Sequence, residues 1–273
     1  MVPLAVLVLV LGSALVHALW NVLFARGGRG IGVLAVTNVA GFVVWAPVAL
    51  GRWRIEAAAW PYLLISSAIQ VYYLLVLNRA YARAPAHTVY PVARGLGPVL
   101  VLAASFAGGT RVPAWAVVAV GLISAGVWLT GTGSVDRRVL GAAFPVAVSL
   151  AGFPFAAAYG LRHADPATYL WLSTLPLTVG TLAVALVTAR PGLRAALRPA
   201  TVGTGVGMVA AGGLTMAALA MVEPSQVPAV AALRETGILF VVPLSWLIDR
   251  TFAGRAATGA VLVFAGVALL AVS

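Results

Sequence analysis

The chain contains no cysteine and no lysine, and only six of its 273 residues are acidic. Without cysteine, disulfides and thiolate metal sites are excluded. Charged residues make up 8% of the sequence, whereas a soluble domain carries about 25%. A soluble protein of this length would need far more polar surface, so we expect the chain to lie in a lipid bilayer.

Hydrophobic residues are abundant, at 62% of the chain with a mean hydropathy of +1.05, and all 17 basic residues are arginine. In a soluble protein the net charge of +11 would suggest nucleic-acid binding. Here the arginines mostly flank apolar runs, which is typical of residues that orient membrane spans, so no nucleic-acid partner is expected. The first apolar run has no basic residue before Arg26 and is too long for a secretory signal, so we interpret it as a span.

Ten apolar segments are long enough to cross a bilayer, and short loops join them. They are 3–25, 31–50, 59–79, 87–108, 113–132, 139–161, 168–189, 200–221, 226–248 and 255–272. Five glycines make 200–221 the weakest of them as an isolated helix. The predicted fold is an all-α membrane protein whose halves, 1–135 and 136–273, are inverted five-helix repeats.

The repeat is visible when the sequence is shifted by 140 residues. In one gapless register the shift superimposes Arg94 on Arg234, Gly97 on Gly237, Val101 on Val241, Ser105 on Ser245 and 125–127 on 265–267. Because each half has an odd number of spans, the second half enters the membrane from the opposite side. Arg94 lies about 12 Å and Arg234 about 13 Å into their spans, so both are expected near the midplane.

The loop arginines are distributed unequally between the two ends of the predicted bundle. Eleven follow the odd-numbered spans and four lie on the other side, at Arg52, Arg54, Arg111 and Arg162. Since arginine accumulates on the cytoplasmic side, this bias predicts that both termini lie outside the cytoplasm.

Arg94 and Arg234 each lie within an apolar segment, where a charge costs at least roughly 2.5–3.5 kcal/mol and normally faces a cavity or a partner. Glu235 is the single acidic residue within a span. Adjacent helical positions point about 100° apart, so Glu235 is poorly placed to pair with Arg234 and better placed to pair with Arg94. One arginine then keeps its charge, which favours an anionic or zwitterionic small-molecule substrate. The alternative is that the arginines form structural ion pairs.

Other polar residues share helix faces that should point into the protein. His17, Trp20 and Asn21 lie on one face of the first span, and Tyr90 lies four residues before Arg94. His17 is a candidate for proton coupling or a hydrogen-bonded packing residue, and Trp20 is alternatively an interface anchor. Cavity lining or packing is expected of Gln70, Tyr73, Tyr159 and Trp171.

No catalytic constellation is present in the sequence, so an enzyme is not predicted. The three histidines, His17, His87 and His163, lack metal-ligand spacing. The run 203–207 lacks the third glycine and the preceding strand of a dinucleotide loop. We therefore expect no cofactor and no metal.

Three motifs, His17-Ala-Leu-Trp-Asn21, Tyr90-Pro-Val-Ala-Arg-Gly-Leu-Gly-Pro98 and Leu233-Arg-Glu-Thr236, resemble the bacterial EamA-type transporters of the drug/metabolite transporter superfamily. The resemblance covers essentially the whole chain. It implies a ten-span secondary transporter in the bacterial inner membrane, with a central cavity lined by spans one to four and six to nine. Such proteins commonly export metabolites, amino acids or drugs.

The chain departs from this pattern in places. Relatives often end spans four and nine with an acidic motif, of which Asp249 alone is kept, and the proton-coupling carboxylate of small multidrug-resistance relatives is replaced by His17. Many members have cytoplasmic termini, against the arginine count here. A flippase for a lipid-linked sugar and a non-transporting scaffold subunit stay open as alternatives. Two repeats build a complete cavity, so a monomer is expected rather than an obligate dimer.

Overall fold

A computed structural model describes residues 2–26, 30–131, 135–237, 240 and 254–272. Within these ranges the chain is helical and forms no strand. The α-helices are α1 (Leu4–Arg26), α2 (Ile31–Gly51), α3 (Trp60–Arg83), α4 (Ala86–Ala107), α5 (Ala114–Leu129), α6 (Arg137–Gly160), α7 (Pro166–Thr188), α8 (Arg190–Ala196), α9 (Pro199–Leu219), α10 (Val227–Arg234) and α12 (Gly254–Val272). Three short 3-10 turns, η1 (Ala57–Ala59), η2 (Pro224–Gln226) and η3 (Glu235–Gly237), complete the described elements.

Seven of these helices are long and apolar enough to cross a membrane, namely α1, α2, α3, α4, α6, α7 and α9. Shorter apolar helices cover Ala114–Leu129 and Ala257–Ala271. Large apolar side chains also point outward, among them Leu4, Val187 and Phe264, which are 76%, 84% and 65% exposed. Helices that are apolar on all sides need lipid rather than water around them. The all-helical fold is therefore that of a membrane protein.

The glycine-rich segment 200–221, the weakest span in the sequence, forms α9. Its glycines lie where neighbouring side chains leave no room for a larger residue. A Cβ atom on Gly207 would lie 2.8 Å from the Cβ of Trp20, and one on Gly213 would lie 2.5 Å from the Trp45 ring. Small residues in α9 thus allow the close helix packing that stabilises the helix in the bundle.

The segment 226–248 departs from the expected continuous helix. The α-helix α10 ends at Arg234 and continues as the 3-10 turn η3. The Thr236 hydroxyl donates to the Leu233 carbonyl at 2.6 Å, so a side chain supplies a hydrogen bond to one of the last carbonyl groups of the helix. The rest of this predicted span, 238–239 and 241–248, lies outside the described residues. The predicted loop at 190–196 also differs, because Pro191 in its first turn favours the short helix α8.

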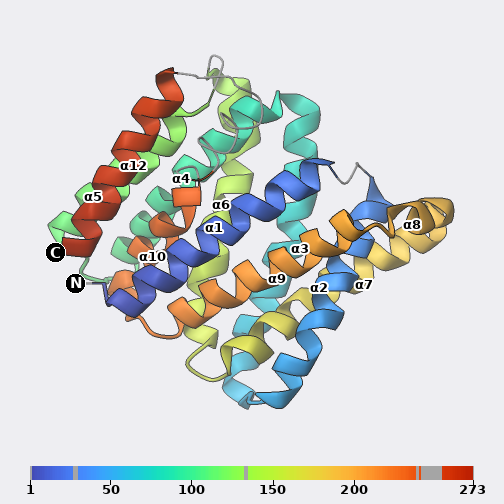
Figure 1. Ribbon diagram of the computed structural model, residues 1–273. Helices are drawn as coiled ribbons and strands as arrows, with labels where there is room; N and C mark the ends of the chain where they lie inside the picture. The colour runs from blue at the N-terminus through green and yellow to red at the C-terminus, as the bar shows by residue number, and fades with distance from the viewer. Residues whose placement is uncertain (1, 27–29, 132–134, 238–239, 241–253, 273) are drawn as a thin grey trace.

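Helices from the two halves of the chain pack against one another throughout the bundle. The main pairs are α1 with α9, α3 with α6, α2 with α7 and α5 with α12, and α4 also packs on α6. Figure 1 shows α5 and α12 side by side at one edge and α2 with α7 toward the opposite edge. The two chain ends lie at the same end of the bundle (Figure 1). Neither half is therefore packed as a separate body.

At the end that bears the termini, the link from α2 to α3 contacts the link from α6 to α7. Ile55 and Ala164 form an isolated antiparallel bridge. Arg52 pairs with Asp165 at 3.1 Å, and the Asp165 side chain also accepts the Ala167 amide at the start of α7. One acidic residue thus caps a helix and ties the two links together.

Candidate functional site

Arg94 is the centre of a polar cluster within the bundle. Its Nη1 donates to Oε2 of Glu235 at 2.7 Å, and its Nη2 donates to Nε2 of His17 at 2.9 Å. The guanidinium also lies over the Tyr90 ring, with Cζ 4.6 Å from the ring centroid. The cluster therefore joins α4 to α1 and η3, across 77 and 141 residues of sequence.

The pair of Arg94 and Glu235 is almost wholly removed from solvent, with side chains 12% and 6% exposed. A buried ion pair gains little over apolar packing, but removing one partner costs about 3–5 kcal/mol because the other charge is left unmatched. The end of α10 at Arg234 places Glu235 in the following 3-10 turn, where it reaches α4. The predicted pair between the two halves is thus present.

His17 is neutral in this arrangement. A guanidinium can only donate, so Nε2 of His17 must accept the bond from Arg94, and the ring proton lies on Nδ1. The ring of Trp20 meets that of His17 edge-on, with centroids 4.7 Å apart. Asn21 donates from its side chain to the His17 carbonyl at 2.7 Å, so it binds its own helix.

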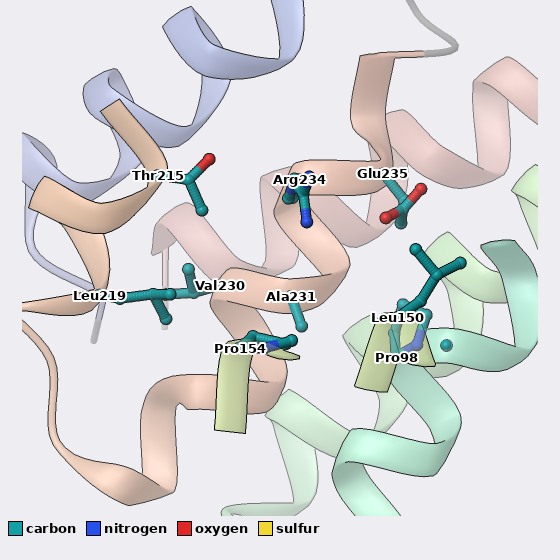
Figure 2. A pocket seen from close by; sticks show the side chains of 10 residues that line it. Pro98, Leu150, Pro154, Thr215, Leu219, Val230, Ala231, Arg234 and Glu235 are labelled. Carbon is teal, nitrogen blue, oxygen red and sulfur yellow. The ribbon is translucent and has the colours of Figure 1, made fainter. Parts of the chain in front are cut away.

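Arg234 makes no hydrogen bond or ion pair with any residue in the described part of the chain. It lines a cavity, together with Gly97, Pro98, Leu150, Pro154, Thr215, Leu219, Val230, Ala231 and Glu235. Figure 2 shows Arg234 between Thr215 and Glu235, with the prolines on the other side of the cavity. The space open to the centre of a water molecule is about 10 Å³, roughly enough for one water.

Net charge distinguishes the two arginines. The carboxylate of Glu235 compensates Arg94, whereas Arg234 has no such contact among the described residues and faces the cavity. Since a free charge within apolar surroundings is costly, an anionic group beside Arg234 would offset part of that cost. The Thr215 hydroxyl is near but already engaged, because it donates to the Ala211 carbonyl at 3.1 Å and shares a 2.8 Å bond with Ser13.

Other residues expected to line a cavity lie elsewhere. The Gln70 side chain donates to the Ser173 carbonyl at 3.1 Å, and the Trp171 indole donates to the Phe42 carbonyl at 3.0 Å. These bonds fasten α3 and α2 to α7. Tyr73 is different: it packs against an apolar cluster formed by α3, α4 and α6, and it also lies within electrostatic range of Arg94, Arg234 and Glu235.

Tyr159 lines a second cavity near the end that bears the termini, where Cζ of Arg162 lies 5.3 Å from its ring centroid. The predicted residues therefore fall into a central group and a peripheral one. The central group is Arg94, Arg234, Glu235, Tyr90, Tyr73, His17, Trp20 and Asn21.

Sequence reasoning missed Thr215 and Pro154, which line the cavity beside Arg234. A single threonine or proline in an apolar helix carries no pattern that identifies its position. Within the described ranges, no group of three or more His, Asp or Glu side chains could hold a metal ion.

No protein-family model and no curated protein matches the chain. A solved structure does. It is described only as "Crystal structure of protein", and the likeness covers 97% of this chain and 96% of that one, with a TM-score of 0.72 and 16% sequence identity. At that identity the likeness extends to the fold alone, over nearly the full length of both chains.

Proposed function

We propose that the protein is a secondary transporter of the EamA type, which moves a small anionic or zwitterionic metabolite through the centre of the bundle by alternating access. The observation that carries this proposal is that Arg234, which has no ion-pair partner in the part of the chain that the structure describes, lines a cavity beside the ion pair of Arg94 and Glu235. Ionisable groups held within a membrane bundle are costly and usually serve a function. The cavity lies within one chain, so a monomer suffices.

An inverted repeat of ten spans is supported by the contacts between helices. A shift of 140 residues exchanges α1 with α6, α3 with α9, α4 with α10 and α5 with α12. Under this exchange the contact of α1 with α9 becomes that of α6 with α3, and the contact of α4 with α6 becomes that of α10 with α1. Each of these contacts is present. Such an exchange is expected when two similar halves are related by a two-fold axis.

The contact between α5 and α12 supports the same relation at atomic detail. A Cβ atom on Gly126 would lie 2.6 Å from the carbonyl oxygen of Gly259. A Cβ atom on Gly266 would lie 2.8 Å from the carbonyl oxygen of Ala119. Adding 140 to 126 and 119 gives 266 and 259, so the two close approaches are equivalent. Matched contacts of this kind are expected of two halves related by a two-fold axis, which supports the proposed repeat.

The bundle is closed around Arg234. Its cavity holds roughly one water, whereas sites for small organic ligands occupy about 300–1,000 Å³. Transport therefore requires a second conformation in which helices around the cavity separate. The prolines that line the cavity, Pro98 in α4 and Pro154 in α6, each remove a helical hydrogen bond and provide places to bend.

Orientation follows from the arginines at the two ends of the bundle. The end opposite the termini carries Arg79, Arg83, Arg137, Arg190 and Arg194 among others. The positive-inside tendency favours this end as the cytoplasmic one, with both termini outside, in a bacterial inner membrane. Proton coupling would involve His17 or Glu235, since both contact Arg94.

Ligand binding at Arg234 can be tested on purified protein by a thermal-shift screen of small carboxylates, phosphate esters, amino acids and organic cations. A ligand that binds the folded state alone raises its stability, by about 2.7 kcal/mol at a hundred times its dissociation constant. We expect anionic or zwitterionic compounds to stabilise the wild type and to lose this effect in Arg234→Gln. The exposed Arg194→Gln is the matched control. Stabilisation by cations alone, or equal stabilisation of Arg234→Gln, would contradict the proposed site.

A further inference from the structure

Two small cavities lie between the same three parts of the chain. The inner cavity, beside Arg234, is lined by Pro154 of α6, Leu219 of α9 and Ala231 of α10. The outer cavity is lined by Ala158 of α6, Val222 just after α9, and Val227 of α10. Each cavity has room for roughly one water molecule.

The spacing of the lining residues stacks the cavities along the bundle axis. On α6 the residue that lines the outer cavity comes four positions after the one that lines the inner cavity. At the end of α9 it comes three positions after, and on α10 it comes four positions before. Each step is close to one helical turn, about 5.4 Å. Because α6 and α9 run toward the end that bears the termini and α10 runs away from it, all three steps point toward that end.

Each cavity is lined by one arginine; the inner cavity is also lined by Glu235, whose carboxylate pairs with Arg94. The outer cavity is lined by one charged side chain, that of Arg162, which lies over the Tyr159 ring and is exposed at the end of α6. Neither Arg162 nor Arg234 forms an ion pair with a residue that the structure describes. An anion that enters from this end would meet Arg162 first and Arg234 next.

The walls between the cavities contain places to bend. Pro154 lies inside α6, where it removes the hydrogen bond that its backbone nitrogen would donate to Leu150. On the other wall, the non-helical residues 220–223 join α9 to η2 and provide the place to bend; Pro224 and Pro228 stand in the first turns of η2 and α10, where a proline removes no helical hydrogen bond. Bending at prolines is the ordinary cause of kinks in membrane helices, so separation of α6 from α10 needs no unfolding.

We propose that the interface of α6, α9 and α10 is the route by which a small organic anion, with a carboxylate or phosphate group, passes between Arg234 and the end that bears the termini, and that the outer cavity is the mouth of this route. The proposal rests on the transport function above. It adds a direction of access and a second arginine, Arg162, that the anion passes.

The natural absence of cysteine makes the route testable with single reporters. Ala231→Cys and, as a second reporter, Leu219→Cys would be placed in lipid nanodiscs and treated with a sulfonate-bearing or a trimethylammonium-bearing methanethiosulfonate reagent. We expect the anionic reagent to react about tenfold faster than the cationic one, since fixed positive charge concentrates anions. Arg162→Gln should reduce this ratio, and Arg111→Gln, in a loop at the same end, should leave it unchanged.

Blocking the mouth is the companion test. Ala158→Trp, which fills the outer cavity, should slow labelling of both reporters about tenfold or more. Val148→Trp, which adds the same side chain on the lipid-exposed face of α6, should have no effect. The proposal is overturned if Ala158→Trp does not slow labelling, if Arg162→Gln does not change the ratio of the anionic to the cationic labelling rate, or if both reporter variants fold but never react. If labelling behaves as expected but liposomes with the protein move no solute, the transport function fails while the connection between the cavities stands.

Discussion

Glu235 is the residue whose neutralisation should damage the fold most. Glu235→Gln removes the carboxylate that pairs with Arg94 and leaves the guanidinium groups of Arg94 and Arg234 without an ion-pair partner among the described residues. Removing one partner of a buried pair costs about 3–5 kcal/mol. A domain of 150–250 residues loses about 2–4 °C in Tm per kcal/mol, so we expect Tm to fall by roughly 6–20 °C.

The converse change, Arg94→Gln, should cost less than Glu235→Gln. It leaves one negative and one positive charge in adjacent residues, Glu235 and Arg234, instead of two positive ones. The double variant Arg94→Gln/Glu235→Gln removes both members of the pair and should be more stable than Glu235→Gln alone. Thermal unfolding of the four proteins in one detergent completes a double-mutant cycle, which isolates the energy of the pair.

Glu56→Gln is the matched control for this cycle. It removes the carboxylate from an exposed pair with His163, whose side chains are 57% and 37% exposed at a separation of 3.0 Å. Exposed pairs contribute about 0–1 kcal/mol, so Tm should move by no more than about 4 °C. The reasoning is refuted if Glu235→Gln changes Tm no more than this control, or if the double variant loses the sum of both single losses.

Three further results are expected. Arg234→Gln should leave Tm unchanged or raise it, because it removes a charge that has no ion-pair partner among the described residues, while anion transport falls at least about tenfold. A loss of stability like that of Glu235→Gln would contradict this. Gly126→Leu should lower the free energy of unfolding by at least about 1–3 kcal/mol, because even its Cβ atom would lie 2.6 Å from a carbonyl oxygen of α12. Gly121→Leu is the control: no atom lies within 4 Å of its Cβ position, so chemical or thermal unfolding should be unchanged. Protonation of His17 would replace the acceptor that faces Arg94 with a donor, so transport should change as the pH is lowered. In His17→Gln the side-chain oxygen accepts the same bond without titrating, so the pH profile should become flat. An unchanged profile would exclude His17 as the coupling group.

The sequence was most informative where physical constraint was strong. Apolar length alone predicted helices that the structure describes for nine of the ten predicted spans, all but 226–248, because a membrane permits few other backbone arrangements. The spacing of Arg94 and Glu235 in the two halves also indicated their pairing, since a buried charge requires a partner.

Other features of the site depend on how helices from distant parts of the sequence pack together, which the sequence of one segment does not determine. The α-helix α10 ends at Arg234, three residues before Gly237 and inside a segment long enough to span the bilayer, so its end was not predicted. Gln70 and Trp171 are polar and semi-polar residues in predicted spans, but their bonds to backbone carbonyls of neighbouring helices depend on which helices lie together. Residues such as Thr215 become part of the cavity for the same reason.

Solute efflux from liposomes tests the central claim most directly. Liposomes that contain the protein would be loaded with an equal mixture of carboxylates, phosphate esters, zwitterionic amino acids and organic cations, diluted, and analysed for retained solute by mass spectrometry. The account predicts faster loss of one or more anionic or zwitterionic solutes with the wild type than with protein-free liposomes, and no such loss with Arg234→Gln. Retention of every solute by the wild type, or equal loss with folded Arg234→Gln, would contradict it.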